Sequence, residues 1–133
     1  MSRIKICGLR RPEDIAAVNE ARPDYCGFIV EYPKSRRSID RATLRELVRG
    51  LREEIVPVGV FVNAPKELVA ELLEEGTIQI AQLHGQESQE YIQELKVLTE
   101  KPLIQAFSIK SKEDVERARE SVADYILLDQ GSG

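Results

Sequence analysis

Short apolar runs alternate along this chain with longer segments in which apolar residues recur every three or four positions. The runs predict strands at residues 3–7, 25–30, 56–62, 78–83, 103–107 and 125–128. The segments between them predict amphipathic helices at residues 12–21, 41–53, 65–75, 88–99 and 112–121. Because two parallel strands need a crossover, and a helix is the usual one, this alternation predicts an α/β fold with parallel strands.

Capping residues support three of the predicted helices. Asp40 precedes the second helix, Asn63 with Pro65 marks the third, and Ser111 followed three residues later by Asp114 marks the fifth. Local chemistry therefore agrees with the overall pattern.

Two architectures satisfy the alternation: an open doubly wound sheet and a (β/α)8 barrel. Polar or reactive residues follow nearly every predicted strand: Cys7, the loop at 32–37, Asn63, His84, Ser108 and Asp129. A barrel gathers all such ends around one mouth, whereas an open sheet lets only those beside its switch point share a ligand. We therefore favour the barrel and keep the open sheet as the structural alternative.

Composition limits the function classes. The 133 residues are 42% hydrophobic and 32% charged, which is typical of one soluble globular domain. A net charge of −4, with only a small basic cluster at residues 34–41, argues against nucleic-acid or membrane-surface binding. With no apolar run near the roughly 20 residues that span a bilayer, we expect a cytoplasmic protein. Cys7 and Cys26 are then free thiols.

The first predicted strand carries two candidate site residues. Alternation places Lys5 and Cys7 on the face that points into a barrel, while Ile4 and Ile6 pack against helices. A lysine there requires a carboxylate partner, which the sequence does not identify. Cys7 is equally well read as a small buried apolar residue, and Cys26 is assigned to the core.

Three further positions have both a structural and a functional interpretation. His84 at a strand end is held by backbone hydrogen bonds or contacts a ligand. Arg36 and Arg37 are solvated loop residues or bind an anionic substrate. Asp129, directly after an apolar run, starts a turn or serves in a site, since burying an unused carboxylate is costly.

Five motifs, in order, carry a resemblance to a known family. They are IKICGLRRPEDI, GFIVEYPKSRRSI, GVFVN, QLHG and YILLDQGSG, and together they run from the first predicted strand to the last residue. In these motifs and their separations the chain resembles phosphoribosylanthranilate isomerase of tryptophan biosynthesis, a (β/α)8-barrel family of roughly 200 residues. The resemblance implies that residues 1–133 form one domain, a partial barrel of the first six strand-helix units.

The resemblance also implies a reaction, the Amadori rearrangement of N-(5-phosphoribosyl)anthranilate to 1-(2-carboxyphenylamino)-1-deoxyribulose 5-phosphate. This is an aldose-ketose isomerisation of a small phosphosugar, and it needs no metal or other cofactor. By the family's motifs, Asp129 is the general acid and Cys7 the general base. Arg37 holds the anthranilate carboxylate, and His84 and Gln82 also belong to the substrate site.

These roles place different demands on the two catalytic groups. Asp129 has to hold a proton near neutral pH, which its apolar neighbours Leu127 and Leu128 favour. Cys7 has to be available as a thiolate, for which Lys5 or an arginine supplies the positive charge.

The last two strand-helix units of the family would bind the substrate phosphate. We therefore expect the 133-residue chain alone to be a poor enzyme. Six strands leave two open edges, which favours a homo-oligomer or swapped assembly. The functional alternative is a non-catalytic module that binds anions or self-associates through those edges.

Overall fold

The computed structural model describes residues 5–84 and 87–129, with Asp129 described in its backbone only. Its strands are β1 (Lys5–Cys7), β2 (Tyr25–Val30), β3 (Ser38–Ile39), β4 (Val56–Phe61), β5 (Ile80–Leu83), β6 (Leu103–Ser108) and β7 (Tyr125–Asp129). Its helices are α1 (Pro12–Ala21), α2 (Arg41–Arg49), α3 (Lys66–Glu74), α4 (Gln89–Leu98) and α5 (Lys112–Arg119). The predicted order of strands and helices is confirmed.

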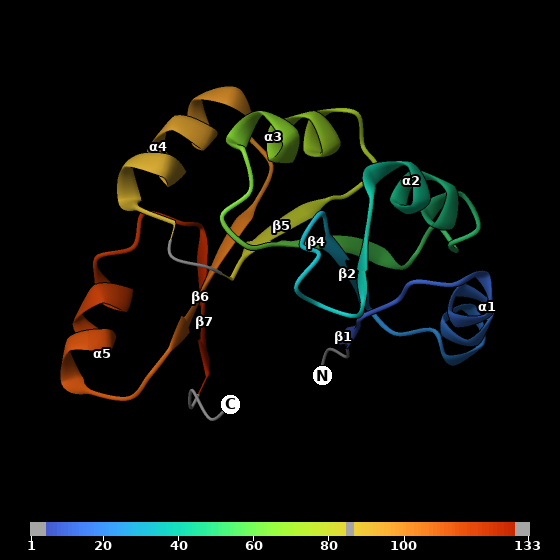
Figure 1. Cartoon of the computed structure of the whole chain (residues 1–133), viewed down its shortest axis with the longest axis horizontal. Helices are drawn as coiled ribbons and strands as arrows, with labels where there is room; N and C mark the ends of the chain where they lie inside the picture. The colour runs from blue at the N-terminus through green and yellow to red at the C-terminus, as the bar shows by residue number, and fades with distance from the viewer. Residues whose placement is uncertain (1–4, 85–86, 130–133) are drawn as a thin grey trace.

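The strands form one parallel sheet whose spatial order follows the chain. The order is β1-β2-β4-β5-β6-β7, and the two-residue strand β3, which the sequence analysis missed, pairs beside β2. A doubly wound sheet reverses its strand order at a switch point, and this sheet does not. Figure 1 shows the sheet curling into an incomplete barrel, with the helices along its outer side. The barrel-type α/β fold is therefore confirmed, and the open-sheet alternative is wrong.

The outer face of the sheet carries most of the core. Fully buried side chains of the strands meet fully buried side chains of the helices there, among them Phe28, Phe61, Leu83 and Leu103 from the sheet and Leu44, Leu72 and Leu95 from the helices. Burying a side chain of this size stabilises the fold by about 1.5 to 3 kcal/mol. This outer layer fixes the position of the strands whose inner face carries the candidate site.

The helix starts agree with the predicted caps at two of three places. The Asp40 carboxylate accepts from the Thr43 backbone N–H at 2.8 Å, and Asp114 accepts from the Ser111 N–H at 3.2 Å. Asn63 does not cap α3, because the helix starts only after Pro65. Asn63 instead takes a left-handed conformation with φ of 51°, which asparagine tolerates better than most residues, and it turns the chain out of the sheet.

The edge strands β1 and β7 each pair with a single neighbour within the described residues. Four side chains of β7 are 43 to 62% exposed: Tyr125, Ile126, Leu127 and Leu128. Such an apolar, half-paired strand is a surface that another element can cover. None of the described helices is long and apolar enough to span a membrane.

Two leucines three positions apart in α4 test the outer core. Leu95 is fully buried and Leu98 is 44% exposed. We expect Leu95→Ala to lower the free energy of unfolding by about 2 to 5 kcal/mol, because it leaves a cavity under the helix. The matched variant Leu98→Ala is expected to change it by about 0.5 kcal/mol or less. Urea unfolding followed by circular dichroism measures both, and equal losses would contradict this packing.

Candidate functional site

Cys7 lies at the carboxyl end of β1 with its thiol exposed. It is paired in register with Gly27 of β2, whose missing side chain makes room for it. A Cβ at position 27 would lie 2.9 Å from the Cys7 Sγ and 3.2 Å from the Lys5 Cε. Lys5 and Cys7 therefore share the inner face, as alternation predicts, while Ile6 packs against the outer core.

Lys5 donates a hydrogen bond to Gln82, which lies on β5 on the same inner face. Within the described residues, the hydrogen-bond partner of Lys5 is this amide oxygen and not the carboxylate that the sequence analysis expects. The other end of the Gln82 amide meets the Nδ1 atom of His84 at 3.2 Å. Two residues of the QLHG motif are thus joined to the first strand across the sheet.

Arg37 lies against Gly8, the residue that follows Cys7. A Cβ at Gly8 would be 2.6 Å from the Arg37 Cδ and 2.7 Å from its Nη1, and Gly8 has a φ of +83° that favours glycine. The neighbouring Arg36 is held by its backbone, because Arg10 donates to the Arg36 carbonyl at 3.0 Å. The Arg37 side chain thus lies against the end of β1.

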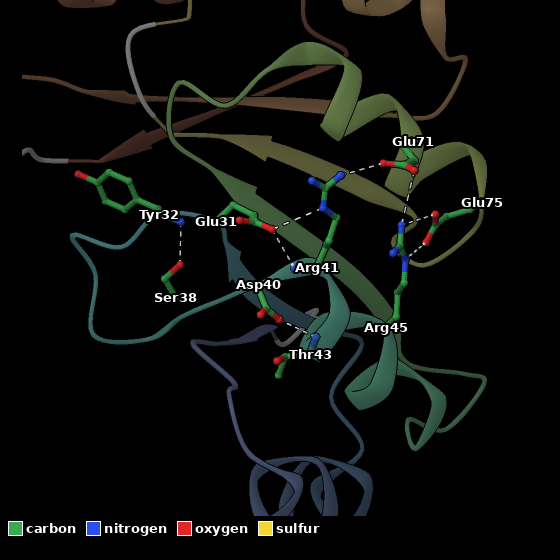
Figure 2. A network of polar contacts seen from close by, with 9 residues as sticks. All are labelled: Glu31, Tyr32, Ser38, Asp40, Arg41, Thr43, Arg45, Glu71 and Glu75. Atoms are coloured by element: carbon green, nitrogen blue, oxygen red, sulfur yellow. Dashed lines mark hydrogen bonds and ion pairs between the residues drawn. The ribbon is translucent and has the colours of Figure 1, made fainter.

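A polar network holds the loop that carries Arg37 (Figure 2). At its start the Glu31 carboxylate accepts from the Arg41 backbone N–H at 3.1 Å, and the Tyr32 N–H donates to the Ser38 hydroxyl at 2.7 Å. The Arg41 side chain continues to Glu71 of α3 at 3.2 Å. Both ends of the loop are thereby fixed to α2 and α3.

The network extends along α2 to a second arginine. Arg45 makes two hydrogen bonds to Glu75, at 2.7 and 2.9 Å, and lies 3.7 Å from Glu71. The hydrogen bond from Arg45 holds the pKa of the Glu75 carboxyl below its usual value. Exposed ion pairs contribute only about 0 to 1 kcal/mol each, so we assign this network to orienting the loop rather than to stability.

Cys26 is fully buried on the outer face, as the sequence analysis predicts. Burial, and next the neighbouring charge of Cys7, raises the pKa of the Cys26 thiol to about 12. A thiol in this state is neutral and unreactive at ordinary pH. The two cysteines of the chain therefore have opposite environments.

Asp129 is the last residue of β7 and pairs in register with Ser108 of β6. Its side chain lies outside what the structure describes, so its predicted role as an acid stays a prediction. The backbone places it at the carboxyl end of one edge strand, while Cys7 ends the opposite edge strand. The inner-face side chains of Lys5, Gln82, Tyr125 and Leu127 border a hollow of about 400 Å³ between these edges.

A second hollow, of about 640 Å³, opens at the carboxyl end of β6. His84, Ser108, Gln105 and Arg117 are among its lining residues. Within the described part of the chain, no group of three His, Cys, Asp or Glu side chains is placed to hold a metal ion. The groups at this end of the sheet include a thiol, an imidazole and guanidinium groups, together with the carboxylates of Glu87 and Glu120. A thiol and an imidazole are groups that can transfer protons.

Sequence reasoning missed the two glycines that bring this site together. Gly8 belongs to the motif IKICGLRRPEDI and Gly27 to GFIVEYPKSRRSI. The contact of Gly8 with Arg37 and that of Gly27 with Cys7 form only when separate segments of the chain come together in the fold. A glycine inside a predicted strand was the available signal, because it often marks close approach of another group.

The fold and the site define a barrel-type α/β protein with a polar cluster at the carboxyl end of its strands. The model of the N-(5'-phosphoribosyl)anthranilate isomerase family matches residues 4–133. The isomerase of Acetivibrio thermocellus is 43% identical over 135 residues, which cover 97% of this chain and 61% of that protein. The chain therefore belongs to the phosphoribosylanthranilate isomerase family.

Solved structures give the same result. The phosphoribosylanthranilate isomerase of Thermotoga maritima matches with a TM-score of 0.82 and 35% identity, covering 97% of this chain and 62% of the other. A phosphoribosylanthranilate isomerase in complex with reduced 1-(o-carboxyphenylamino)-1-deoxyribulose 5-phosphate has the same score and identity, covering 97% and 65%. The chain thus spans about three fifths of the length of these relatives.

The two thiols should react at very different rates. In the folded chain we expect a disulfide reagent to modify Cys7 rapidly and Cys26 only after unfolding, because Cys26 is buried and its pKa is raised to about 12. Absorbance of the released thiolate measures both phases. Cys7→Ser should remove the fast phase and Cys26→Ala the slow one, and a fast phase that survives in Cys7→Ser would contradict the assignment.

Proposed function

We propose that the protein containing this chain converts N-(5-phosphoribosyl)anthranilate to 1-(2-carboxyphenylamino)-1-deoxyribulose 5-phosphate in tryptophan biosynthesis. The observation that carries the proposal is the family match over residues 4–133. The related structure that holds a reduced form of this product supports the same substrate class. The chain covers about three fifths of its relatives, so residues 1–133 are proposed as the first five strand-helix units of the barrel followed by its sixth strand, β7.

The chemistry needs one acid and one base. Asp129 gives a proton to the ring oxygen as the bond from this oxygen to the anomeric carbon breaks, leaving a protonated Schiff base on the anthranilate nitrogen. The thiolate of Cys7 then removes the proton from the neighbouring sugar carbon, and the electron pair moves to form an enolamine. The enolamine becomes the ketone by proton transfer. Each proton transfer of this kind contributes about 10² to 10⁴ in rate.

The remaining residues of the site are proposed to bind the substrate. Arg37, fixed against Gly8, holds the anthranilate carboxylate with its planar guanidinium. His84 faces the larger hollow, and Gln82 contributes through its contact with His84. Lys5 lies beside Cys7 over Gly27 and is proposed to supply positive charge next to the catalytic base. Two reduced thiols suit a cytoplasmic protein, which is where we place this reaction.

Matched variants of the whole protein that contains this chain test the proposal. Cys7→Ser and Asp129→Asn should each lower kcat by at least about 100-fold, because each removes one proton transfer. Cys26→Ala is the control for Cys7 and should keep kcat. Arg37→Lys should raise KM more than its neighbour Arg36→Lys, since lysine cannot form the paired hydrogen bonds to a carboxylate. Chromatography of the product measures these rates, and an unchanged kcat in Cys7→Ser would refute the base.

A second candidate function rests on the exposed apolar side chains of β7, which are 43 to 62% exposed. Copies of the 133-residue chain could pair or exchange strands there and form an assembly that does not depend on catalysis. We expect the purified chain to sediment as a dimer or larger species, and Leu128→Lys to shift it towards the monomer. Sedimentation velocity at several concentrations measures this, and a monomer throughout would remove the candidate.

A further inference from the structure

Three polar side chains form a continuous hydrogen-bonded chain on the inner face of the sheet. Lys5 starts it on β1, Gln82 of β5 stands in the middle, and His84 follows at the carboxyl end of β5. Gln82 is 4% exposed, so its amide has almost no access to solvent. Within the described residues, no buried side-chain nitrogen or oxygen lacks a hydrogen-bond partner. Within the described part of the chain, Lys5 and His84 are the partners found at the two ends of this amide.

The chemistry of the three groups allows one arrangement of protons. A lysine ammonium only donates hydrogen bonds, so the Gln82 carbonyl oxygen has to face Lys5. The Gln82 NH₂ group then faces His84 and donates, which requires Nδ1 of the ring to accept. A neutral imidazole that accepts at Nδ1 carries its proton at Nε2. The identity of residue 5 thus determines the tautomer of residue 84.

The reversed amide is costly at this position. It would point an NH₂ group at the Lys5 ammonium, so two donors would face each other in a nearly solvent-free place. A glutamate at position 82 would behave differently from glutamine, because a carboxylate accepts at both ends. Glutamine is therefore the side chain that links a donor on one side to an acceptor on the other.

We propose that Gln82 is a positioning residue that, anchored by Lys5, holds His84 in the tautomer protonated at Nε2. Nε2 lies on the side of the ring away from Gln82, and His84 lines the hollow of about 640 Å³. The ring thereby presents a fixed hydrogen-bond donor to an oxygen of a bound ligand. That this ligand is the phosphosugar substrate rests on the proposed function, whereas the tautomer itself does not.

The single histidine of the chain allows a direct test. Long-range ¹H–¹⁵N correlation spectra of the chain, labelled with ¹⁵N-histidine and recorded in mildly alkaline buffer, distinguish protonated from unprotonated ring nitrogens. We expect Nε2 to give the shift of a protonated nitrogen and Nδ1 that of an unprotonated one. The opposite assignment, or rapid averaging between the two, would overturn the proposal without any variant.

Two substitutions separate positioning from simple packing. Gln82→Glu should reverse the pattern, since the carboxylate draws a proton to Nδ1, and Lys5→Met should give a mixture of tautomers because the amide is free to turn. The control is Gln79→Glu, which places a new carboxylate beside Lys101, 3.3 Å from the present Gln79 oxygen. The control should leave the ring signals as in the wild type. Unchanged signals in a folded Gln82→Glu chain would overturn the proposal.

The outcome is separate from that of the proposed function. The predicted tautomer in a protein that does not isomerise the substrate would leave the positioning role standing and remove the reaction. Normal turnover in a protein whose His84 is protonated at Nδ1 would leave the reaction standing and remove the positioning role. In the active protein, Gln82→Glu should raise KM at least about 10-fold, in line with the loss of one hydrogen bond to a bound ligand.

Discussion

Parallel pairing in chain order is the constraint on which the site depends. Each register pair fixes which side chains share the inner face: Cys7 stands beside Gly27, and Gln82 beside Val60 and Ile104. Because all strands run in one direction, their carboxyl ends meet at one rim of the curled sheet. The shared strand direction therefore collects residues at this rim that are far apart in sequence.

The second requirement is close approach, which two glycines supply. At Gly27 the neighbouring strand carries Cys7 and Lys5 over the place where a side chain would stand. At Gly8 the Arg37 side chain occupies the same kind of space. The surface network from Glu31 to Glu75 then holds the Arg37 loop from outside. The position of the Arg37 guanidinium therefore depends on the absence of a side chain at Gly8 and on the ion pairs that anchor the loop.

The sequence was sufficient for the order of strands and helices, because hydrophobic periodicity and caps such as Asp40 are local signals. It also predicted that Lys5 and Cys7 share a face, since strand alternation is a local rule. The short strand β3 and the contact of Arg37 with Gly8 were not predictable in this way. Both depend on a loop that returns to the sheet, and hydrogen bonds such as that from Tyr32 to Ser38 form only in the folded chain.

The partner of Lys5 shows most clearly what tertiary structure adds. The sequence analysis expects a carboxylate partner for Lys5, because a buried ammonium is usually paired with an opposite charge. Gln82 instead satisfies the hydrogen bond and leaves the charge in place within the described residues. The Lys5 Cε and the Cys7 Sγ both lie over Gly27, so the ammonium and the thiol are neighbours on the inner face. The NH₂ group of the same amide faces the His84 ring. One neutral side chain therefore contacts both the ammonium of β1 and the imidazole at the end of β5.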